Sequence, residues 1–510
     1  MSASPSSEIF DLLVVGGGVN GAGIARDAAG RGLRVLLVEQ DDLAAHTSSA
    51  STKLIHGGLR YLEFFEFGLV RKALAEREVL FGIAPHIMYP LRFVMPHDAA
   101  LRPAWMIRVG LFLYDHLAQR KTLAGSRGID LRRHAAGAAL QAGFRRGFEY
   151  ADGWVDDARL VVLNALDAHE RGATVRTRTR CEGLRAVTTD AAPTLWSATL
   201  LAPGAAPEQV QARAVVNATG PWAAALHDAA VPGVSRHGLR LVKGSHIVVP
   251  RLFDHPYAYI LQATDRRIVF AIPYEGDFTL IGTTDVEYGD DPRTPRIGAD
   301  EIGYLCAEAS RYFRKAVRAE QVVWAYSGVR PLLEDETADA RAVSRDYALE
   351  LQPTPAPLLT VFGGKITTYR VLAEEVMQRL SPLLGCTRTD WTGTTPLPGG
   401  DLQDSFEGFV QRLINSHPGL SRALLERLAR AYGSRALHIL GAPGQGAEPL
   451  GLEIAPGLFE AELRHLVEHE WACTAEDILW RRSKLGLRMD AGASQAVTEW
   501  LTAHAAARGG

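Results

Sequence analysis

The segment DLLVVGGGVNGAGIARDAAGRGLRVLLVEQ, residues 11–40, decides the fold of this chain of 510 residues. It starts with the apolar run LLVV, which is typical of a buried parallel strand. Three glycines with the spacing G-x-G-x-x-G follow: Gly16, Gly18 and Gly21. Small residues then predict a helix over Ala22–Ala29, and a second apolar run ends on Glu39. The order strand, glycine turn, helix, strand and acid predicts a dinucleotide site.

Each part of this segment has a physical role in binding a dinucleotide. Gly16 permits the tight turn out of the strand, Gly18 lets the backbone approach a pyrophosphate, and Gly21 lets the helix lie close to the strand. The helix N-terminus presents unpaired N–H groups to the anion. Glu39 accepts hydrogen bonds from an adenosine ribose and repels a 2′-phosphate. The structural alternative is a glycine turn that binds nothing.

Composition places the chain among globular proteins and argues against several classes of function. It is 47% hydrophobic and 22% charged with a formal net charge of −3, so roughly two to four domains and no nucleic-acid partner are expected. The four cysteines lie far apart without a C-x-x-C motif, which argues against a metal site and favours a cytoplasmic location. No window reaches the roughly 18 uninterrupted apolar residues of a membrane span.

The order of segment types predicts an α/β fold with a discontinuous first domain. Segments typical of nucleotide binding recur along the chain, and runs rich in Ile, Val and Phe between them indicate an antiparallel sheet. The predicted ranges are 8–70, 147–225 and 355–385 for a Rossmann-type dinucleotide-binding domain, 71–146 and 226–354 for an inserted antiparallel β-sheet substrate domain, and 386–510 for an all-helical C-terminal domain.

Two further segments carry expectations about the fold. Asp190–Pro207 is rich in Ala and Pro and is predicted to be a loop. Arg102–Leu117 is strongly apolar but includes Arg108 and Asp115, so it is too polar to span a bilayer. It is predicted to be either a core helix or a helix lying in a membrane interface.

A run of hydroxyl residues and a glycine pair follow the dinucleotide segment. The hydroxyl residues are Thr47, Ser48, Ser49, Ser51 and Thr52, and such a run suits a helix start or the edge of a phosphate or ring. The sequence HGGLRY at 56–61 places two glycines beside His, Arg and Tyr, which indicates a backbone pressed against a flat ligand. A capped helix followed by a glycine turn is the alternative.

These segments resemble those of a known family. The sequence is similar to the FAD-dependent, aerobic respiratory glycerol-3-phosphate dehydrogenases of the D-amino-acid-oxidase-like flavoprotein superfamily. The resemblance covers about residues 10–490 and is carried by GGGVNGAGIARDAAGRGL (16–33), TSSASTKLIHGGLRYLE (47–63), LRPAWMIRVGLFLYDHL (101–117), RGFEYADGWVDDARLV (146–161), VNATGPW (216–222), LVKGSHIVVPR (241–251), IGTTDVEY (281–288), YSGVRPL (326–332), VFGGKITTYR (361–370) and ILWRRSKLGL (478–487). The anaerobic members of the family carry extra C-terminal cysteines that this chain lacks.

The resemblance implies a cofactor and a reaction. The cofactor is FAD, and the reaction is oxidation of sn-glycerol 3-phosphate to dihydroxyacetone phosphate, with a hydride passing from C2 to flavin N5 and electrons passing to ubiquinone or another membrane quinone. The residues expected to contact FAD are Gly16, Gly18, Asn20, Gly21, Glu39, Gln40, Thr47, Ser48, Ser49, Lys53, Leu54, His56, Gly58, Ala218, Gly220, Gly364, Lys365, Ile366 and Thr367.

The resemblance also implies the residues of a substrate site. Arginine binds phosphate bidentately, and the predicted substrate-binding residues are Arg60, Tyr61, Arg330, Arg345 and Lys365. Lys365 is also expected to stabilise negative charge on the reduced flavin. The predicted catalytic residues are Arg330 and two candidate bases, His56 and His246. In each case the alternative is a solvated surface cation or a satisfied structural histidine.

A lipid-soluble acceptor requires contact with the membrane. We therefore expect a homodimer attached peripherally to the inner face of the cytoplasmic membrane, with Arg102–Leu117 as a candidate contact. Three other classes of protein remain open at this point: a flavoprotein oxidase that acts on glycerol 3-phosphate or an amino acid and uses oxygen, an NAD-dependent dehydrogenase, and a non-catalytic nucleotide-binding regulator.

Overall fold

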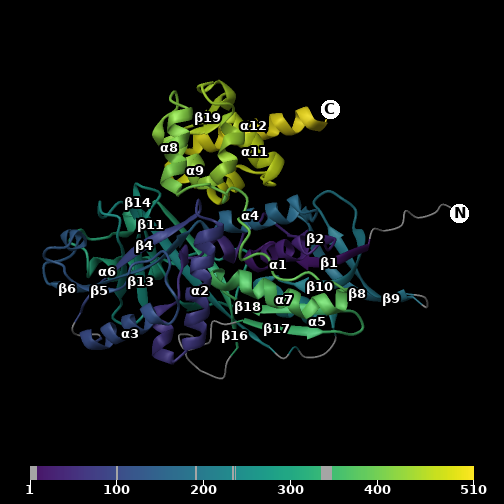
Figure 1. Ribbon diagram of the computed structural model, residues 1–510, viewed down its shortest axis with the longest axis horizontal. Helices are drawn as coiled ribbons and strands as arrows, with labels where there is room; N and C mark the ends of the chain where they lie inside the picture. Colours follow the sequence, from purple (N-terminus) through teal and green to yellow (C-terminus); the bar gives the residue numbers. More distant parts are fainter. Residues whose placement is uncertain are drawn as a thin grey trace.

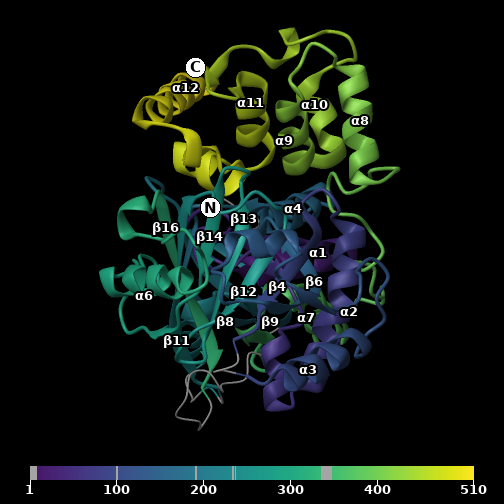
Figure 2. The ribbon, with the colours of Figure 1, turned by 90° about the vertical axis from the view of Figure 1, so that its left-hand side faces the viewer.

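Two large β-sheets form the body of the molecule, and a helical domain covers one end of them (Figure 1). The computed structural model describes residues 9–98, 102–189, 192–231, 235, 237–334 and 347–509. In Figure 1 and in the view turned by 90° (Figure 2) the helical domain, coloured green to yellow, lies at the top. Helix α3 (Ala104–His116) lies at the opposite end of the molecule in both views.

The first sheet contains the predicted dinucleotide segment at its centre. Its order is β17-β18-β10-β1-β2-β7, and β8 and β9 extend it from β10. Pairing is parallel from β18 through β7, whereas β17 and β9 pair antiparallel with their neighbours. The strands are β1 (Ile9–Val15), β2 (Val35–Val38), β7 (Thr174–Arg176), β8 (Arg180–Thr189), β9 (Ala192–Leu201), β10 (Glu208–Asn217), β17 (Tyr347–Gln352) and β18 (Leu358–Gly363).

The alternation of side chains along β1 explains why both faces of this sheet are covered. Leu12 and Val14 point into a core shared with α1, α4 and α7, whereas Leu13 and Val15 point into a core formed with β8, β9 and α5. The helices are α1 (Val19–Gly30), α4 (Asp157–Glu170), α5 (Ala223–Ala230) and α7 (Tyr369–Leu384). A parallel strand with two covered faces reads as a continuous apolar run, as LLVV does.

The second sheet is mixed and larger. Its order is β15-β11-β14-β13-β12-β4-β6-β3, with β16 paired to β11 and β5 paired to β6. The strands are β3 (Leu54–Ile55), β4 (Met88–Pro96), β5 (Arg127–Asp130), β6 (Arg146–Val155), β11 (Leu239–Pro250), β12 (Ala258–Gln262), β13 (Ile268–Tyr274), β14 (Phe278–Gly282), β15 (Val286–Glu287) and β16 (Trp324–Leu333). Helix α6 (Ala299–Ser310) covers one face, and α2 (Phe67–Ile83) with α3 covers the other.

The C-terminal domain has its own apolar core. Its helices are α8 (Phe406–Ser416), α9 (Arg422–Tyr432), α10 (Ala436–Leu440), α11 (Glu460–His469) and α12 (Ala491–Gly509). Leu425, Leu428, Leu463 and Leu466 lie in this core at helical spacing. The ribbon β19 (Glu453–Ala455) with β20 (Leu458–Phe459) is a departure from the all-helical prediction.

Sheet membership departs from the predicted domain ranges at three strands. β3 and β6, which were expected in the dinucleotide domain, pair in the second sheet, because β6 forms long antiparallel ladders with β4 and β5. β17, expected in the substrate domain, pairs with β18 in the first sheet. The predicted loop Asp190–Pro207 contains β9, whose alternating residues Trp196, Ala198 and Leu200 are buried.

Helix α3 has the core-facing side chains predicted for Arg102–Leu117 as a core helix, and the alternative, a helix in a membrane interface, stays a prediction. Ile107, Leu111 and Tyr114 are buried in the core under the second sheet. On the other side of the helix the large apolar side chains are exposed: Trp105, Met106, Val109, Phe112 and Leu113. Phe64, Phe65 and Phe67, from the segment that leads into α2, are also exposed. One face of α3 therefore serves the core, and the other presents apolar surface to solvent.

Candidate functional site: a cavity at the strand ends

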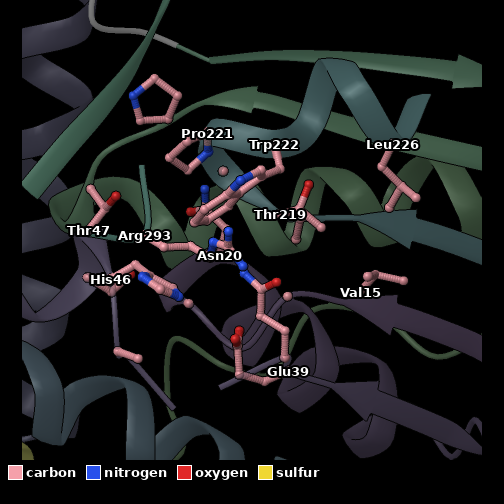
Figure 3. A pocket seen from close by; sticks show the side chains of 18 of the residues that line it. Val15, Asn20, Glu39, His46, Thr47, Thr219, Pro221, Trp222, Leu226 and Arg293 are labelled. Atoms are coloured by element: carbon pink, nitrogen blue, oxygen red, sulfur yellow. The ribbon is translucent and has the colours of Figure 1, made fainter. Parts of the chain in front are cut away.

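A cavity of about 640 Å³ opens at the carboxyl ends of the parallel strands in the first sheet (Figure 3). The predicted residues that line it are Gly16, Gly18, Asn20, Glu39, Gln40, Thr47, Ser48, Ala218, Gly220, Gly364 and Ile366. Ligands of open α/β sheets bind at this edge, where crossovers leave in different directions. The position of the cavity is therefore that of a nucleotide site.

The glycine turn between β1 and α1 is closed by the backbone of β10. Gly16 has a φ of +112°, and a Cβ there would lie 2.5 Å from the carbonyl oxygen of Ala218. A Cβ on Gly21 would overlap the carbonyl oxygen of Gly16. A Cβ on Gly18 would lie 3.0 Å from Ser48 Oγ and near no backbone atom, so this part of the backbone faces the cavity. Gly16 and Gly21 thus serve packing, whereas Gly18 gives a ligand access to the helix start.

Glu39 stands at the end of β2 and is held by two backbone donors. Gly17 N donates to its Oε2 at 2.6 Å, and Asp41 N donates to its Oε1 at 2.9 Å. Burial raises the pKa of Glu39, and the hydrogen bonds from Asp41 and Gly17 oppose that rise. The carboxyl group lines the cavity with its oxygens fixed, which suits it to accept hydrogen bonds from ribose hydroxyls.

The hydroxyl run forms a short 3₁₀ helix, η1 (Thr47–Ser49), across the helix start from the glycines. Ser48 Oγ accepts from Val19 N at 3.0 Å, and Thr47 Oγ1 donates to Val329 O at 2.7 Å. The side chain of Lys53 is buried and turned away from the cavity, because its Nζ donates to Asp157 Oδ1 at 2.7 Å. The helix-start interpretation of the hydroxyl run thus describes the local structure, and three of its residues, Thr47, Ser48 and Ser51, also line the cavity.

Several side chains on the cavity wall were not among the predicted site residues. They are His46, Thr219, Trp222 and Arg293, shown in Figure 3. His46 meets the Trp222 ring edge-on at 5.1 Å between centroids and lies 2.9 Å from Asp41 Oδ2. The segment VNATGPW, which ends on Trp222, was a signal for this wall, whereas no local pattern marked Arg293.

The remaining predicted residues of the HGGLRY and GGKITT segments meet beside the cavity. Thr367 Oγ1, in η6 (Ile366–Thr368), accepts from His56 N at 3.3 Å. Lys365 Nζ lies over the Tyr61 ring, 4.0 Å from its centroid. Tyr61 and Arg60 belong to the 3₁₀ helix η2 (Leu59–Phe64), which starts at Gly58, where φ is +77°. Two glycine-flanked segments about 300 residues apart therefore bring a cation, Lys365, onto an aromatic ring, Tyr61.

His246 and Arg330 lie in neighbouring strands of the second sheet. Arg330 forms an ion pair with Asp285, and its Nη2 donates to Thr283 Oγ1 at 2.9 Å. The next residue, Pro331, lines the cavity. His246 is fully buried, its Nε2 lies 2.9 Å from Thr52 Oγ1, and its ring stacks on Tyr326. Burial, with the charges of Arg330 and Lys53, holds the pKa of His246 well below its usual range.

His56 lies on the same side of the second sheet as these residues. Its ring meets Phe270 edge-on at 6.4 Å between centroids, and Phe270 and His246 both pair with Gly282 across adjacent strands. Arg345, the remaining predicted substrate residue, lies outside the described residues. Gly21, Ser49, Lys53, Leu54, His56, Gly58, Lys365 and Thr367 are not part of the cavity wall, although each lies in a segment that borders it.

The cavity fits an adenine dinucleotide on three observations. Its floor is a glycine turn that a ligand backbone can approach, its far wall carries a fixed carboxylate, and an aromatic residue, Trp222, closes one side. In addition, Asn20 Oδ1 is buried at the cavity and has no hydrogen-bond partner among the described residues. An unpartnered buried acceptor is costly unless a ligand satisfies it.

Comparison with known proteins agrees with this geometry. Residues 11–370 match the family described as "FAD dependent oxidoreductase", and residues 391–507 match the "C-terminal domain of alpha-glycerophosphate oxidase". A solved structure described as a glycerol-3-phosphate dehydrogenase from Bacillus halodurans complexed with FAD superposes with a TM-score of 0.77 at 27% identity, covering 98% of this chain and 91% of that one.

Relatives of similar length lie closer in sequence. A glycerol-3-phosphate dehydrogenase of Pseudomonas aeruginosa is 52% identical, covering 95% of this chain and 93% of the relative. An aerobic glycerol-3-phosphate dehydrogenase of Escherichia coli is 49% identical over 97% of both chains. A D-erythritol 1-phosphate dehydrogenase of Brucella abortus is also 49% identical, over 97% of this chain and 98% of the relative. The chain is a member of the FAD-dependent oxidoreductase family, in the group that holds the glycerol-3-phosphate dehydrogenases, and its cofactor is FAD.

Proposed function

We propose that this protein oxidises sn-glycerol 3-phosphate to dihydroxyacetone phosphate and passes the electrons to a membrane quinone. The observation that carries the proposal is the match at about half identity, over nearly the whole chain, to dehydrogenases of this substrate. The cationic residues Arg60, Arg330 and Lys365, in segments that border the cavity, support it because a phosphate dianion rewards several cations.

In this proposal Gly18, Glu39 and Ser48 would hold the nucleotide half of FAD, and Gly364 and Ile366 would border its ring. When bound, FAD supplies the acceptor for the hydride that leaves C2 of the substrate and the carrier that delivers the electrons to quinone. The side chains of the protein bind and orient the substrate. Arginines fix the phosphate, and this fixes C2 relative to the cavity.

A base must accept the proton of the C2 hydroxyl, and the two candidate histidines differ in their surroundings. His246 is neutral because its pKa is depressed by burial, Arg330 and Lys53, so it can accept or donate a hydrogen bond at working pH. His56 lies in the glycine-flanked segment that also carries Arg60, one of the proposed phosphate-binding residues. We propose His56 as the proton acceptor and His246 as a neutral residue that orients Thr52.

Absorption spectroscopy tests the proposed substrate. Addition of sn-glycerol 3-phosphate without oxygen is expected to bleach the flavin absorbance of the purified protein. D-erythritol 1-phosphate is the second candidate, because one relative of equal identity carries that name. The ratio of kcat/KM for the two phosphates in a dye-linked assay separates them. A spectrum that neither phosphate bleaches would contradict the proposal, and stoichiometric peroxide in air would identify an oxidase instead.

We further propose that the exposed apolar face near α3 contacts the membrane surface. None of the helices in the described part of the chain is both long and apolar enough to cross a bilayer. Trp105 is 70% exposed and Phe65 79% exposed. Helix α3, which carries Trp105 and Phe112, lies at the end opposite the helical domain (Figure 2). Aromatic side chains at an interface bind reversibly to lipid.

Sedimentation with quinone-containing phospholipid vesicles tests this contact. The double variant W105S/F112S is expected to bind vesicles at least roughly tenfold more weakly, since each loses well over 1 kcal/mol of apolar transfer energy. L452S removes a side chain that is 71% exposed in the helical domain and serves as the matched control. Equal binding of the two variants would exclude α3 as the contact. The homodimer stays a prediction, which sedimentation velocity checks.

A further inference from the structure

A short helical segment of the C-terminal domain, η9 (Asp477–Arg482), contacts two loops that line the nucleotide end of the cavity. The first loop follows β2 and includes Glu39 and Ala44. The second follows β7 and includes Thr179 and Arg180. The three segments lie roughly 130–440 residues apart in sequence. The helical domain therefore contacts the loops of the cofactor cavity through long-range interactions.

The first loop is held through Asp42, which is 2% exposed. Its carboxyl group accepts from Arg481 Nε at 2.6 Å, and from Arg482 Nη1 and Nη2 at 2.7 and 2.8 Å. Neither arginine is part of the cavity wall. A buried carboxylate with two guanidinium partners fixes the loop, because moving Asp42 away from both arginines would leave its buried charge uncompensated.

The second loop is held through Arg178, whose Nη2 donates to Asp477 Oδ2 at 2.6 Å. Burial raises the pKa of Asp477, but the hydrogen bond from Cys473 N and the charges of Arg178 and Arg481 outweigh it and lower the pKa to about 2. The two loops are also joined to each other, because Thr179 N donates to Glu39 O at 2.7 Å. A displacement of either loop therefore moves Glu39.

Helix α4 provides a third connection to the same domain. Lys484 Nζ lies 3.0 Å from Asp156 Oδ1 at the start of α4. One turn on, Arg159 Nη2 donates to Glu470 Oε1 at 2.9 Å. The next residue after Asp156 is Asp157, whose Oδ2 accepts from Ser51 Oγ at 2.7 Å in the loop that carries η1. The loops after β2 and β7 are thus tied directly to the helical domain, and the loop that carries η1 is tied to it through α4.

We propose that the helical C-terminal domain is a clamp on the adenosine diphosphate half of FAD, acting through Arg178, Arg481 and Arg482 as positioning residues. This inference rests on the proposed placement of FAD in the cavity. The arginines set the positions of Glu39 and the neighbouring backbone without touching the cofactor. Loosening the clamp should weaken any ligand that carries adenosine diphosphate.

The test uses full-length protein from which FAD has been removed. Dissociation constants are measured for FAD by flavin fluorescence and for ADP by calorimetry. R178M and R481M each remove one connection, and R178K keeps the charge as the conservative variant. R427M is the matched control, because it removes an arginine that bonds to Glu462 at 2.7 Å within the helical domain, away from the loops.

R178M and R481M are expected to raise both dissociation constants roughly threefold to tenfold, because this is the change in affinity that the free energy of a partly buried ion pair gives. R178K is expected to recover most of the affinity, and R427M to change it less than about twofold even where it lowers the melting temperature. If R178M does not fold, R481M, whose side chain is 11% exposed, carries the test. Unchanged constants in the variants, or equal loss in R427M, would overturn the proposal.

The same titrations separate the clamp from the placement of FAD. If ADP does not compete with FAD in the wild-type protein and E39Q binds FAD normally, the placement is wrong. If ADP competes and E39Q is weakened while R178M and R481M bind as the wild type does, the placement stands and the clamp is excluded.

Discussion

The two ends of the cofactor cavity are formed by different kinds of chemical groups. At the nucleotide end, main-chain groups and glycines at the ends of parallel strands form much of the wall, and the carboxylate of Glu39 is fixed by backbone N–H groups. At the substrate end, the predicted groups are charged and aromatic side chains from segments of both sheets. Each of these has its own side-chain contact, such as Arg330 with Asp285 or Lys365 with Tyr61.

This difference indicates how each end should respond to change. A wall of backbone tolerates almost no added volume. A wall of long side chains adapts to volume but depends on every ion pair. Substitutions at the nucleotide end should therefore change FAD affinity, and substitutions at the substrate end should change KM and pH dependence.

The largest effect is expected at Gly21. In G21A the added Cβ would overlap the carbonyl oxygen of Gly16, so the glycine turn must open. We expect FAD affinity to fall roughly 100-fold, since overpacking of this kind costs up to about 3 kcal/mol. Flavin content after purification and an FAD titration measure it. G82A, in an open position on α2, is the control, and normal flavin content in G21A would contradict the backbone account.

The next effect is expected at the other end, in R330M. Loss of a charged hydrogen-bond donor to phosphate should raise the KM for sn-glycerol 3-phosphate roughly 10- to 50-fold. The dissociation constant for FAD should stay unchanged. R240M breaks another arginine–carboxylate pair in the same sheet, with Glu287, at the same 22% side-chain exposure. An unchanged KM in R330M would remove Arg330 from the phosphate site.

A smaller effect is expected in E39Q. Glutamine has one acceptor oxygen, so either Gly17 N or Asp41 N would face an NH₂ group instead of an acceptor. We expect a weakening of FAD binding of about tenfold with no change in KM. Titration of the apo-protein measures the first and steady-state kinetics the second. E208Q, on the exposed start of β10, is the control and should have the FAD affinity and KM of the wild type. A changed KM in E39Q would contradict the separation of FAD binding from substrate binding.

The smallest effect concerns the pH dependence of stability at His246. Burial, Arg330 and Lys53 hold its folded pKa well below 6.5, so the unfolded chain takes up a proton below pH 6.5 and the folded protein does not. Folding stability should therefore fall by about 1 kcal/mol between pH 6.5 and 5.5 on account of this group. H246N should lose that part of the slope in urea unfolding, whereas H116N, at an exposed position on α3, should keep it.

The fold could be predicted where a local pattern is sufficient. Residues 11–40 form the predicted strand, turn, helix and strand, because each element is encoded by its own residues. The β9 strand was missed because Ala192, Pro193 and Thr194 are typical of a loop, although Trp196, Ala198 and Leu200 alternate into the core. Sheet membership of β6 was missed because pairing with β4 is a long-range property that no local period reports.

The site residues, like the fold, could be predicted where a local pattern is sufficient. The glycine turn, Glu39 and the hydroxyl run around Ser48 were predicted from their residue patterns, and the family resemblance added Ala218 and Gly220, which also line the cavity. Arg293 was missed because it comes from a loop of the second sheet with no motif of its own. Lys53 was predicted as a cofactor residue, yet its side chain bonds to Asp157, a pairing across about 100 residues that its neighbours in sequence do not announce.

The order of the cavity wall along the chain bears on how the protein is made. The wall begins at Val15 in β1 and is completed by Gly363, Gly364 and Ile366 after β18, which pairs beside β10 only once more than two thirds of the chain exists. Domains fold largely as they leave the ribosome, N-terminal parts first. We therefore expect the site to stay incomplete for most of translation and FAD to bind late in biosynthesis.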